Sequence, residues 1–196
     1  MNIVKEVCVE SFDEAFRAVG AGATRIELCE NLSVGGTTPS YGTIRKCTEK
    51  LSVPVMVMIR PRGGNFTYSK DEFEIMQEDI LLCKKLSVTG VVFGILDDIG
   101  NIDEMKTRLL VQLARPMHVT FHKAIDMAAN IMDSVALLKE IGVDRILSSG
   151  GKPTALEGSE TLNRMIELAS PQLSIIVAGK VERETGDTRP RPMFAI

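Results

Sequence analysis

Two short runs of the sequence pair a glutamate with a cysteine two residues later, Glu6 with Cys8 and Glu27 with Cys29. In a strand, side chains two residues apart point to the same face. The opposite face of each run carries only Val, Ile and Leu, which a covering helix would bury, so we expect the glutamates and cysteines to face a shared interior. There the thiols are either small buried apolar groups or, if their sulfurs converge, ligands for a soft ion such as Cu(I).

Two arginines close a third apolar run, with Arg60 at its end and Arg62 just beyond Pro61. A carboxylate is costly to bury without a partner, so Arg60 is the expected counter-ion of Glu6 and Glu27. Two interpretations follow from this pairing. The charges form either a structural ion-pair network or a site in which both arginines bind an anion and a glutamate acts as acid or base.

A histidine, a lysine and an aspartate, His122, Lys123 and Asp126, stand at the end of the fifth apolar run. Asp126 is close enough in the sequence to orient the imidazole of His122 from a loop. A lone histidine is otherwise often a core residue, and we assign that structural role to His118. His122 and Asp126 therefore join the glutamates as candidate catalytic residues, with His122 as proton carrier or electrophile, and Lys123 is a candidate ligand-binding residue.

The sixth apolar run leads into Ser148, Ser149 and Gly150. Hydroxyl and N–H groups in such a turn would surround a phosphate or a carboxylate, or would simply lead into the next helix. These three residues are therefore candidate ligand-binding residues, together with the two arginines.

A scaffold must bring these strand ends together, and the chain alternates apolar runs with segments of helical period. The strand-like runs span residues 3–9, 25–29, 55–60, 90–96, 118–122, 145–148 and 173–178. Helices are expected at residues 11–21, 41–51, 102–114, 131–141 and 155–169, with another beginning after Ser69. Ser11 with Glu14, and Ser69 with Glu72, have the spacing of a capping box.

This alternation predicts a parallel sheet with right-handed crossovers, which closes either as an open doubly wound sheet or as a (β/α) barrel. No GxGxxG motif follows the first strand, and polar residues gather after almost every strand. Both features favour a TIM-type (β/α) barrel with its site at the C-terminal ends of the strands.

The bulk properties exclude several classes of protein. The chain has 196 residues and a net charge of −3, so one domain is expected, with no nucleic acid and no membrane as partner. The N-terminus lacks the apolar core of a signal peptide, which predicts a cytoplasmic location. The 4 cysteines are widely spaced without a CxxC pair, so neither a disulfide framework nor a structural zinc site is expected.

Several strings in this order resemble the CutC family, the copper homeostasis proteins. They are EVCVES at 6–11, RIELC at 25–29, GGTTPS at 35–40, VMIRPRGG at 57–64, VVFG at 91–94, TFH at 120–122 and ILSSG at 146–150. The resemblance implies a TIM-type barrel, a cytoplasmic location and a role in copper handling. It also implies that Cys8 and Cys29 are ligands of Cu(I).

The resemblance covers about residues 3–180 and fails beyond them. The family continues through a helix to an eighth strand, whereas residues 180–196 are charged, include Pro190 and Pro192 and show no helical period. We therefore predict a barrel domain at 1–180, whose last β/α unit is atypical or missing, and an irregular tail at 181–196. The strand edges left open need cover, so a homo-oligomer is expected.

Two functions remain in view. The resemblance implies a cytoplasmic copper homeostasis protein that binds Cu(I). The residues alone favour instead a TIM-barrel enzyme acting on a small anionic substrate, with a phosphate or carboxylate group, at the C-terminal mouth of the barrel; a scaffold without chemistry is the third alternative. Either function makes a metal ion or a small molecule the partner of the site.

Overall fold

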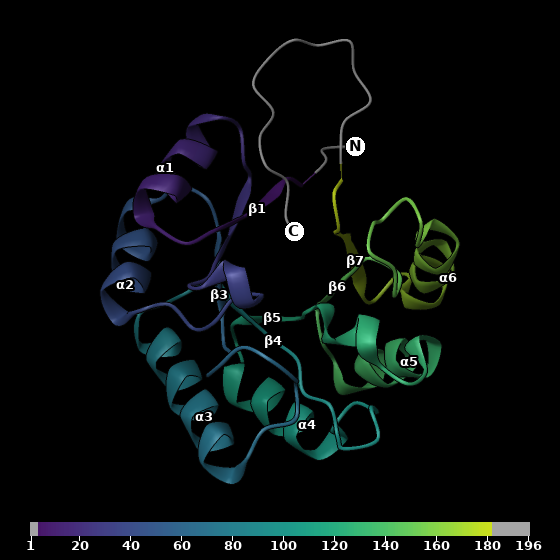
Figure 1. Cartoon of the computed structure of the whole chain (residues 1–196). Coiled ribbons are helices and arrows are strands. Elements are labelled where there is room, and N and C mark those ends of the chain that lie inside the picture. Colours follow the sequence, from purple (N-terminus) through teal and green to yellow (C-terminus); the bar gives the residue numbers. More distant parts are fainter. Residues whose placement is uncertain (1–3, 182–196) are drawn as a thin grey trace, which may run out of the picture.

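The computed structural model of the chain describes residues 4–181, which form a curved sheet of seven parallel strands with α-helices around its outside (Figure 1). The strands are β1 (Glu6–Val9), β2 (Arg25–Leu28), β3 (Val55–Met58), β4 (Gly90–Phe93), β5 (His118–Phe121), β6 (Arg145–Ser148) and β7 (Ser174–Val177). The α-helices are α1 (Phe12–Gly20), α2 (Tyr41–Lys50), α3 (Lys70–Lys85), α4 (Glu104–Ala114), α5 (Ile131–Ile141) and α6 (Ser159–Ala169). Two short 3-10 helices, η1 (Leu32–Val34) and η2 (Lys123–Met127), follow β2 and β5.

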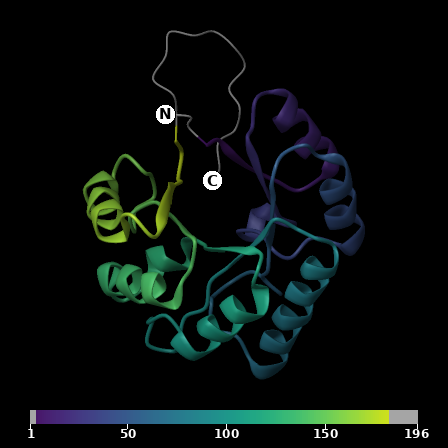
Figure 2. The same ribbon diagram turned by 180° about the vertical axis from the view of Figure 1, so that it is seen from behind.

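The strands lie side by side in the order of the sequence, from β1 to β7. The view from behind shows the same curved wall with the helices on its convex side (Figure 2). The prediction of a TIM-type barrel without a regular last unit is thereby confirmed for the described residues. The predicted tail at 181–196 lies, apart from Val181, outside the described residues.

The helix starts follow local capping chemistry. Ser69 and Glu72 form the predicted capping box, in which each side chain accepts a hydrogen bond from the other residue's backbone N–H. At α1 the hydroxyl of Ser11 accepts from the N–H of Glu14, but the Glu14 carboxylate accepts from the N–H of Glu10 instead of Ser11. The last helix, α6, begins at residue 159, four residues later than the 155 predicted from the sequence.

The strands separate two apolar regions. Outward-facing residues such as Ile26 and Phe121 pack with the helices in the main core. A smaller cluster inside the curved sheet contains Cys29, Met56, Met58 and Val92, with Cys8 and Leu32 against it. The alternation of faces predicted for the Glu-x-Cys pairs is therefore correct, and their sulfurs lie in the interior.

The sheet ends at β1 and β7, and a cavity of about 460 Å³ lies beside these two strands. Ile175, Ile176 and Val177 of β7 are partly exposed to solvent there. An unpaired strand edge readily accepts another chain, so self-association stays a prediction for this protein. Within residues 4–181, no helix combines the length and apolar character that a membrane crossing needs.

Candidate functional site

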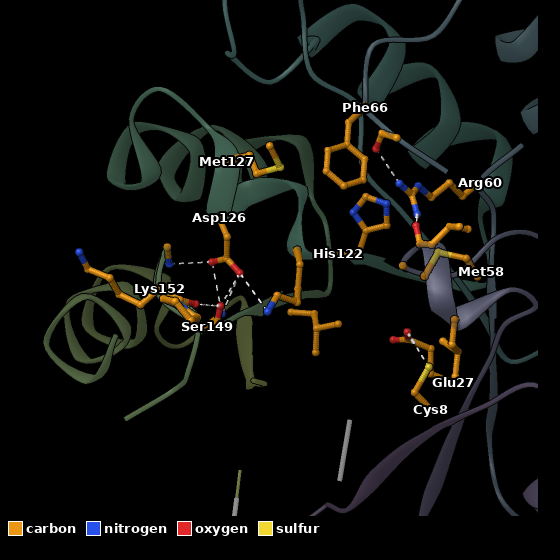
Figure 3. A pocket seen from close by; sticks show the side chains of 18 residues that line it. Cys8, Glu27, Met58, Arg60, Phe66, His122, Asp126, Met127, Ser149 and Lys152 are labelled. Atoms are coloured by element: carbon orange, nitrogen blue, oxygen red, sulfur yellow. Dashed lines mark hydrogen bonds and ion pairs between the residues drawn. The ribbon is translucent and has the colours of Figure 1, made fainter. Parts of the chain in front are cut away.

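A cavity of about 520 Å³ lies at the C-terminal ends of the strands (Figure 3). Two groups of residues line it from inside the curved sheet. Cys8 and Glu27 belong to β1 and β2, and Arg60 and His122 follow β3 and β5. Other lining residues come from the loops and the later strands: Met58, Phe66, Lys123, Asp126, Met127, Leu147, Ser149 and Lys152. This is the end of the barrel at which the sequence predicted a site, and the structure has a cavity there.

Cys8, Glu27 and Cys29 form a compact group inside the sheet. Cys8 lies opposite Glu27 in the parallel register of β1 and β2, and Cys29 follows two residues later on the same face. The two Sγ atoms are 3.4 Å apart, and Oε1 of Glu27 lies 3.6 Å from each of them. One ligand atom from each residue lies within 4.8 Å of the other two, a spacing at which all three can contact one ion.

The surroundings of this group keep it protonated. Burial, followed by the negative charge of Glu6, raises the pKa of Glu27 to about 8. The hydrogen bond with Cys8 and burial raise the pKa of Cys29 well above its usual range. For Cys8 the hydrogen bond from Cys29 lowers the pKa, but burial and the charge of Glu27 outweigh it and the net change is upward. An ion bound here has to displace the thiol protons.

Glu6 does not belong to this cavity, which corrects its prediction as a candidate catalytic residue. It lies nearer the N-terminal end of β1 and lines the cavity beside β7. Its carboxylate pairs with Arg25 of the neighbouring strand, not with Arg60. The reason is register, because Glu6 lies directly opposite Arg25, while Arg60 stands at the other end of the strands.

The predicted pairing of Arg60 with the glutamates is also wrong. Its guanidinium is buried and donates to three backbone carbonyls, those of Val34, Gly36 and Gly64. The loops after β2 and β3 thus supply the negative partial charge that a carboxylate was expected to provide. The Phe66 ring packs on this guanidinium, with 4.9 Å from Cζ to the ring centroid.

His122 is buried and neutral. Its Nδ1 accepts a hydrogen bond from the N–H of Ala124, so the proton of the neutral imidazole is on Nε2. Nε2 is buried and has no hydrogen-bond partner in the part of the chain that the structure describes. Burial, followed by the positive charge of Arg60, lowers the pKa of His122 to about 3. His122 is therefore a hydrogen-bond donor at neutral pH, not a cation.

Asp126 does not orient His122, contrary to the prediction. Its carboxylate instead accepts from the hydroxyls of Ser148 and Ser149 and from the N–H groups of Ser149 and Gly151. The turn after β6 does surround a carboxylate, as its composition indicated, but that carboxylate belongs to the protein. The predicted ligand-binding groups of Ser148 and Ser149 therefore donate to Asp126, and the N–H of Gly150 donates to the hydroxyl of Ser148.

The remaining two predicted cations differ in position. Arg62 pairs with Glu72 at the start of α3 and donates to backbone carbonyls of its own loop, so it is not a lining residue and its predicted anion contact is wrong. Lys123 does line the cavity, with its Nζ 3.8 Å from Asp126. His118 lies at the far end of β5 beside Asp144, in agreement with the structural role assigned to it.

Sequence reasoning missed Phe66, which packs on both Arg60 and His122 at the cavity wall. It lies in an irregular loop, where no periodicity marks a side chain as pointing inward. Gly94, directly after β4, relates instead to the neighbouring imidazole. A Cβ at this position would lie 2.5 Å from Nδ1 of His122, so only glycine leaves room for the imidazole.

The fold and this site define, over residues 4–181, a (β/α) barrel of seven strands with two thiols and a carboxyl group inside its mouth. The model of the CutC family matches residues 3–187, and the chain belongs to this family. It is 44% identical over 180 residues to the copper homeostasis protein cutC homolog of Homo sapiens, covering 92% of this chain and 66% of that protein. It is 41% identical over 183 residues to a family protein CutC of Vibrio vulnificus strain CMCP6, covering 92% and 73%.

Solved structures agree with this assignment. A CutC copper homeostasis protein from Streptococcus agalactiae superposes with a TM-score of 0.87 at 36% identity, covering 92% of this chain and 89% of that one. Deoxyribose phosphate aldolase from Aeropyrum pernix superposes with a TM-score of 0.60 at 16% identity, covering 90% and 75%, which shows the shared barrel fold alone. The chain spans about two thirds of the length of its curated human and mouse relatives.

Proposed function

We propose that this protein takes part in copper handling and binds Cu(I) through the sulfurs of Cys8 and Cys29. The observation that carries the proposal is the 3.4 Å separation of the two Sγ atoms. Soft thiolate ligands select Cu(I) over hard cations, and two sulfurs that converge from neighbouring strands can hold one ion. The name of the human relative, a copper homeostasis protein, supports the same ligand.

The rest of the group suits reversible binding. Glu27 lies 3.6 Å from both sulfurs and already holds a proton at neutral pH, so the thiol protons displaced by an ion leave through the cavity to solvent. Cys8 lines the cavity, whereas Cys29 is fully buried and covered by the backbone of Gly36, so an ion would meet Cys8 first. A cytoplasmic location, where thiols stay reduced, is part of the proposal.

The test is an anaerobic Cu(I) titration against a competing chelator. We expect the double variant Cys8→Ser, Cys29→Ser to lose the high-affinity site of the wild type. The matched control is Cys47→Ala, Cys83→Ala, because these thiols are buried in the main core away from the cavity. Unchanged affinity in the serine variant, or an equal loss in the control, would overturn the proposal.

A further inference from the structure

Two buried donors in the wall of the cavity lack an acceptor. Arg60 uses its terminal nitrogens on backbone carbonyls, but its Nε–H has no hydrogen-bond partner in the described part of the chain. The Nε2–H of His122 has none there either. Leaving a buried donor unpaired costs about 1–3 kcal/mol, so two such donors in one wall need an explanation.

The two donor side chains pack against the same aromatic ring. The Phe66 ring packs on both side chains, with 4.9 Å from its centroid to the His122 ring and 4.9 Å to Cζ of Arg60. Figure 3 shows the three side chains gathered on one side of the cavity. The positive charge of Arg60 is also felt by the imidazole, whose pKa it lowers. Neither group can accept a hydrogen bond from the other, so both donors need an acceptor from outside the pair.

The charge of the cavity favours an anion as that acceptor. Three cationic side chains line it, Arg60, Lys123 and Lys152, against two carboxyl groups, Glu27 and Asp126. Asp126 already accepts hydrogen bonds from the turn after β6. A volume of about 520 Å³ has room for a small organic molecule, well beyond a single water.

We propose that this cavity binds a small oxyanion, a carboxylate or phosphate group, on the Nε–H of Arg60 and the Nε2–H of His122. Both side chains are almost fully buried, at 3% and 4% exposure, so Phe66 has to move aside as the ligand enters. Phe66 can do so because it lies in the loop between β3 and α3 and is itself only partly buried. The proposal does not depend on copper, since it uses neither sulfur.

The chain suits a direct test because it contains only 2 histidines. Protein labelled with ¹⁵N in histidine alone would be titrated with inorganic phosphate and with oxalate at constant ionic strength, and both rings followed by NMR. We expect a saturable shift of the Nε2 resonance of His122 with at least one probe. His118, at the opposite end of β5, should not move. A parallel drift of both rings, or no shift of His122 with either probe, would overturn the proposal and leave ordered water as the partner.

Two variants test the contact further, with their affinity for the responding probe measured by calorimetry. His122→Phe keeps an aromatic ring against Phe66 but removes the donor, and should weaken the binding of the responding probe about tenfold. Phe66→Ala removes the cover and should bind that probe at least as tightly as the wild type. Equal affinity in His122→Phe and wild type would refute the assigned contact. Cu(I) affinity should stay unchanged in His122→Phe, so failure of this proposal and failure of the copper site are distinguishable.

Discussion

The buried imidazole of His122 predicts a specific dependence of stability on pH. Burial and the charge of Arg60 lower its pKa from 6.5 to about 3. Between these values the unfolded chain binds a proton that the folded chain does not, so acid favours unfolding. The contribution of the neutral ring is complete above pH 6.5 and is lost as the pH falls toward 3. It amounts to about 5 kcal/mol in total, of which about 3 kcal/mol is lost by about pH 4.5.

Glu27 gives the opposite dependence of stability on pH. It would obscure the effect of His122 if only the wild type were measured. Its pKa is raised from 4.5 to about 8 by burial first and by the charge of Glu6 second. Between these values the folded chain holds a proton that the unfolded chain has released. The contribution of Glu27 is therefore present below pH 4.5 and is lost as the pH rises through about 8. From pH 4.5 to 6.5 the two slopes oppose each other.

The assay is urea unfolding of the wild type and of His122→Gln at several pH values between about 4 and 7. The difference between the two proteins isolates His122, because Glu27 is common to both. We expect acidification from pH 7 to 4.5 to cost the wild type about 3 kcal/mol relative to the variant. His118→Gln is the matched control, at the half-exposed far end of the same strand, and should keep the His122 slope. A wild-type to His122→Gln difference that is the same at both pH values would refute the buried neutral imidazole.

Three further substitutions test the supports of the site. Gly94→Ala places a Cβ 2.5 Å from His122 and should lower the free energy of unfolding in urea by about 1–3 kcal/mol. The control Gly20→Ala meets nothing within 4 Å and should not lower it. Equal effects of the two substitutions would contradict this packing. Asp126→Ala removes the acceptor of four protein donors and should cost about 3 kcal/mol, so an unchanged melting temperature would argue against the turn described after β6. Ser69→Ala should cost about 1 kcal/mol and Ser69→Thr much less, and identical stabilities would show that the capping box contributes nothing.

The sequence predicted the features that depend on periodicity. Strands of period two and helices of period 3.6 gave the order of the elements and the inward direction of Cys8 and Glu27, and they pointed to the strand ends at which the cavity lies. These inferences succeed because a strand buried on both faces still has to alternate its side chains. The loss of pattern after residue 180 predicted an atypical last unit, and the sheet of the described residues runs from β1 to β7 without an eighth strand.

The predictions that failed concern which polar group meets which. Arg60 was expected to pair with a carboxylate, but loop carbonyls satisfy a guanidinium as well, and loop conformation has no period to reveal it. Asp126 was assigned to His122 by proximity in sequence, yet it reaches the turn after β6, where several N–H and hydroxyl groups converge. Which polar groups form a hydrogen bond depends on their distances and angles in the folded chain, and residue types alone do not determine these.

The two proposed ligands occupy one cavity but depend on different parts of the barrel. Cys8 and Cys29 belong to β1 and β2, and β1 is an end strand of the described sheet. Arg60 and His122 follow β3 and β5, each flanked by paired strands on both sides. A chain that pairs with the edge of β1, which has no neighbouring strand in the described residues, therefore lies closer to the sulfur group than to these two donors. We expect such pairing to leave Arg60 and His122 in place, because both follow strands that are paired on both sides.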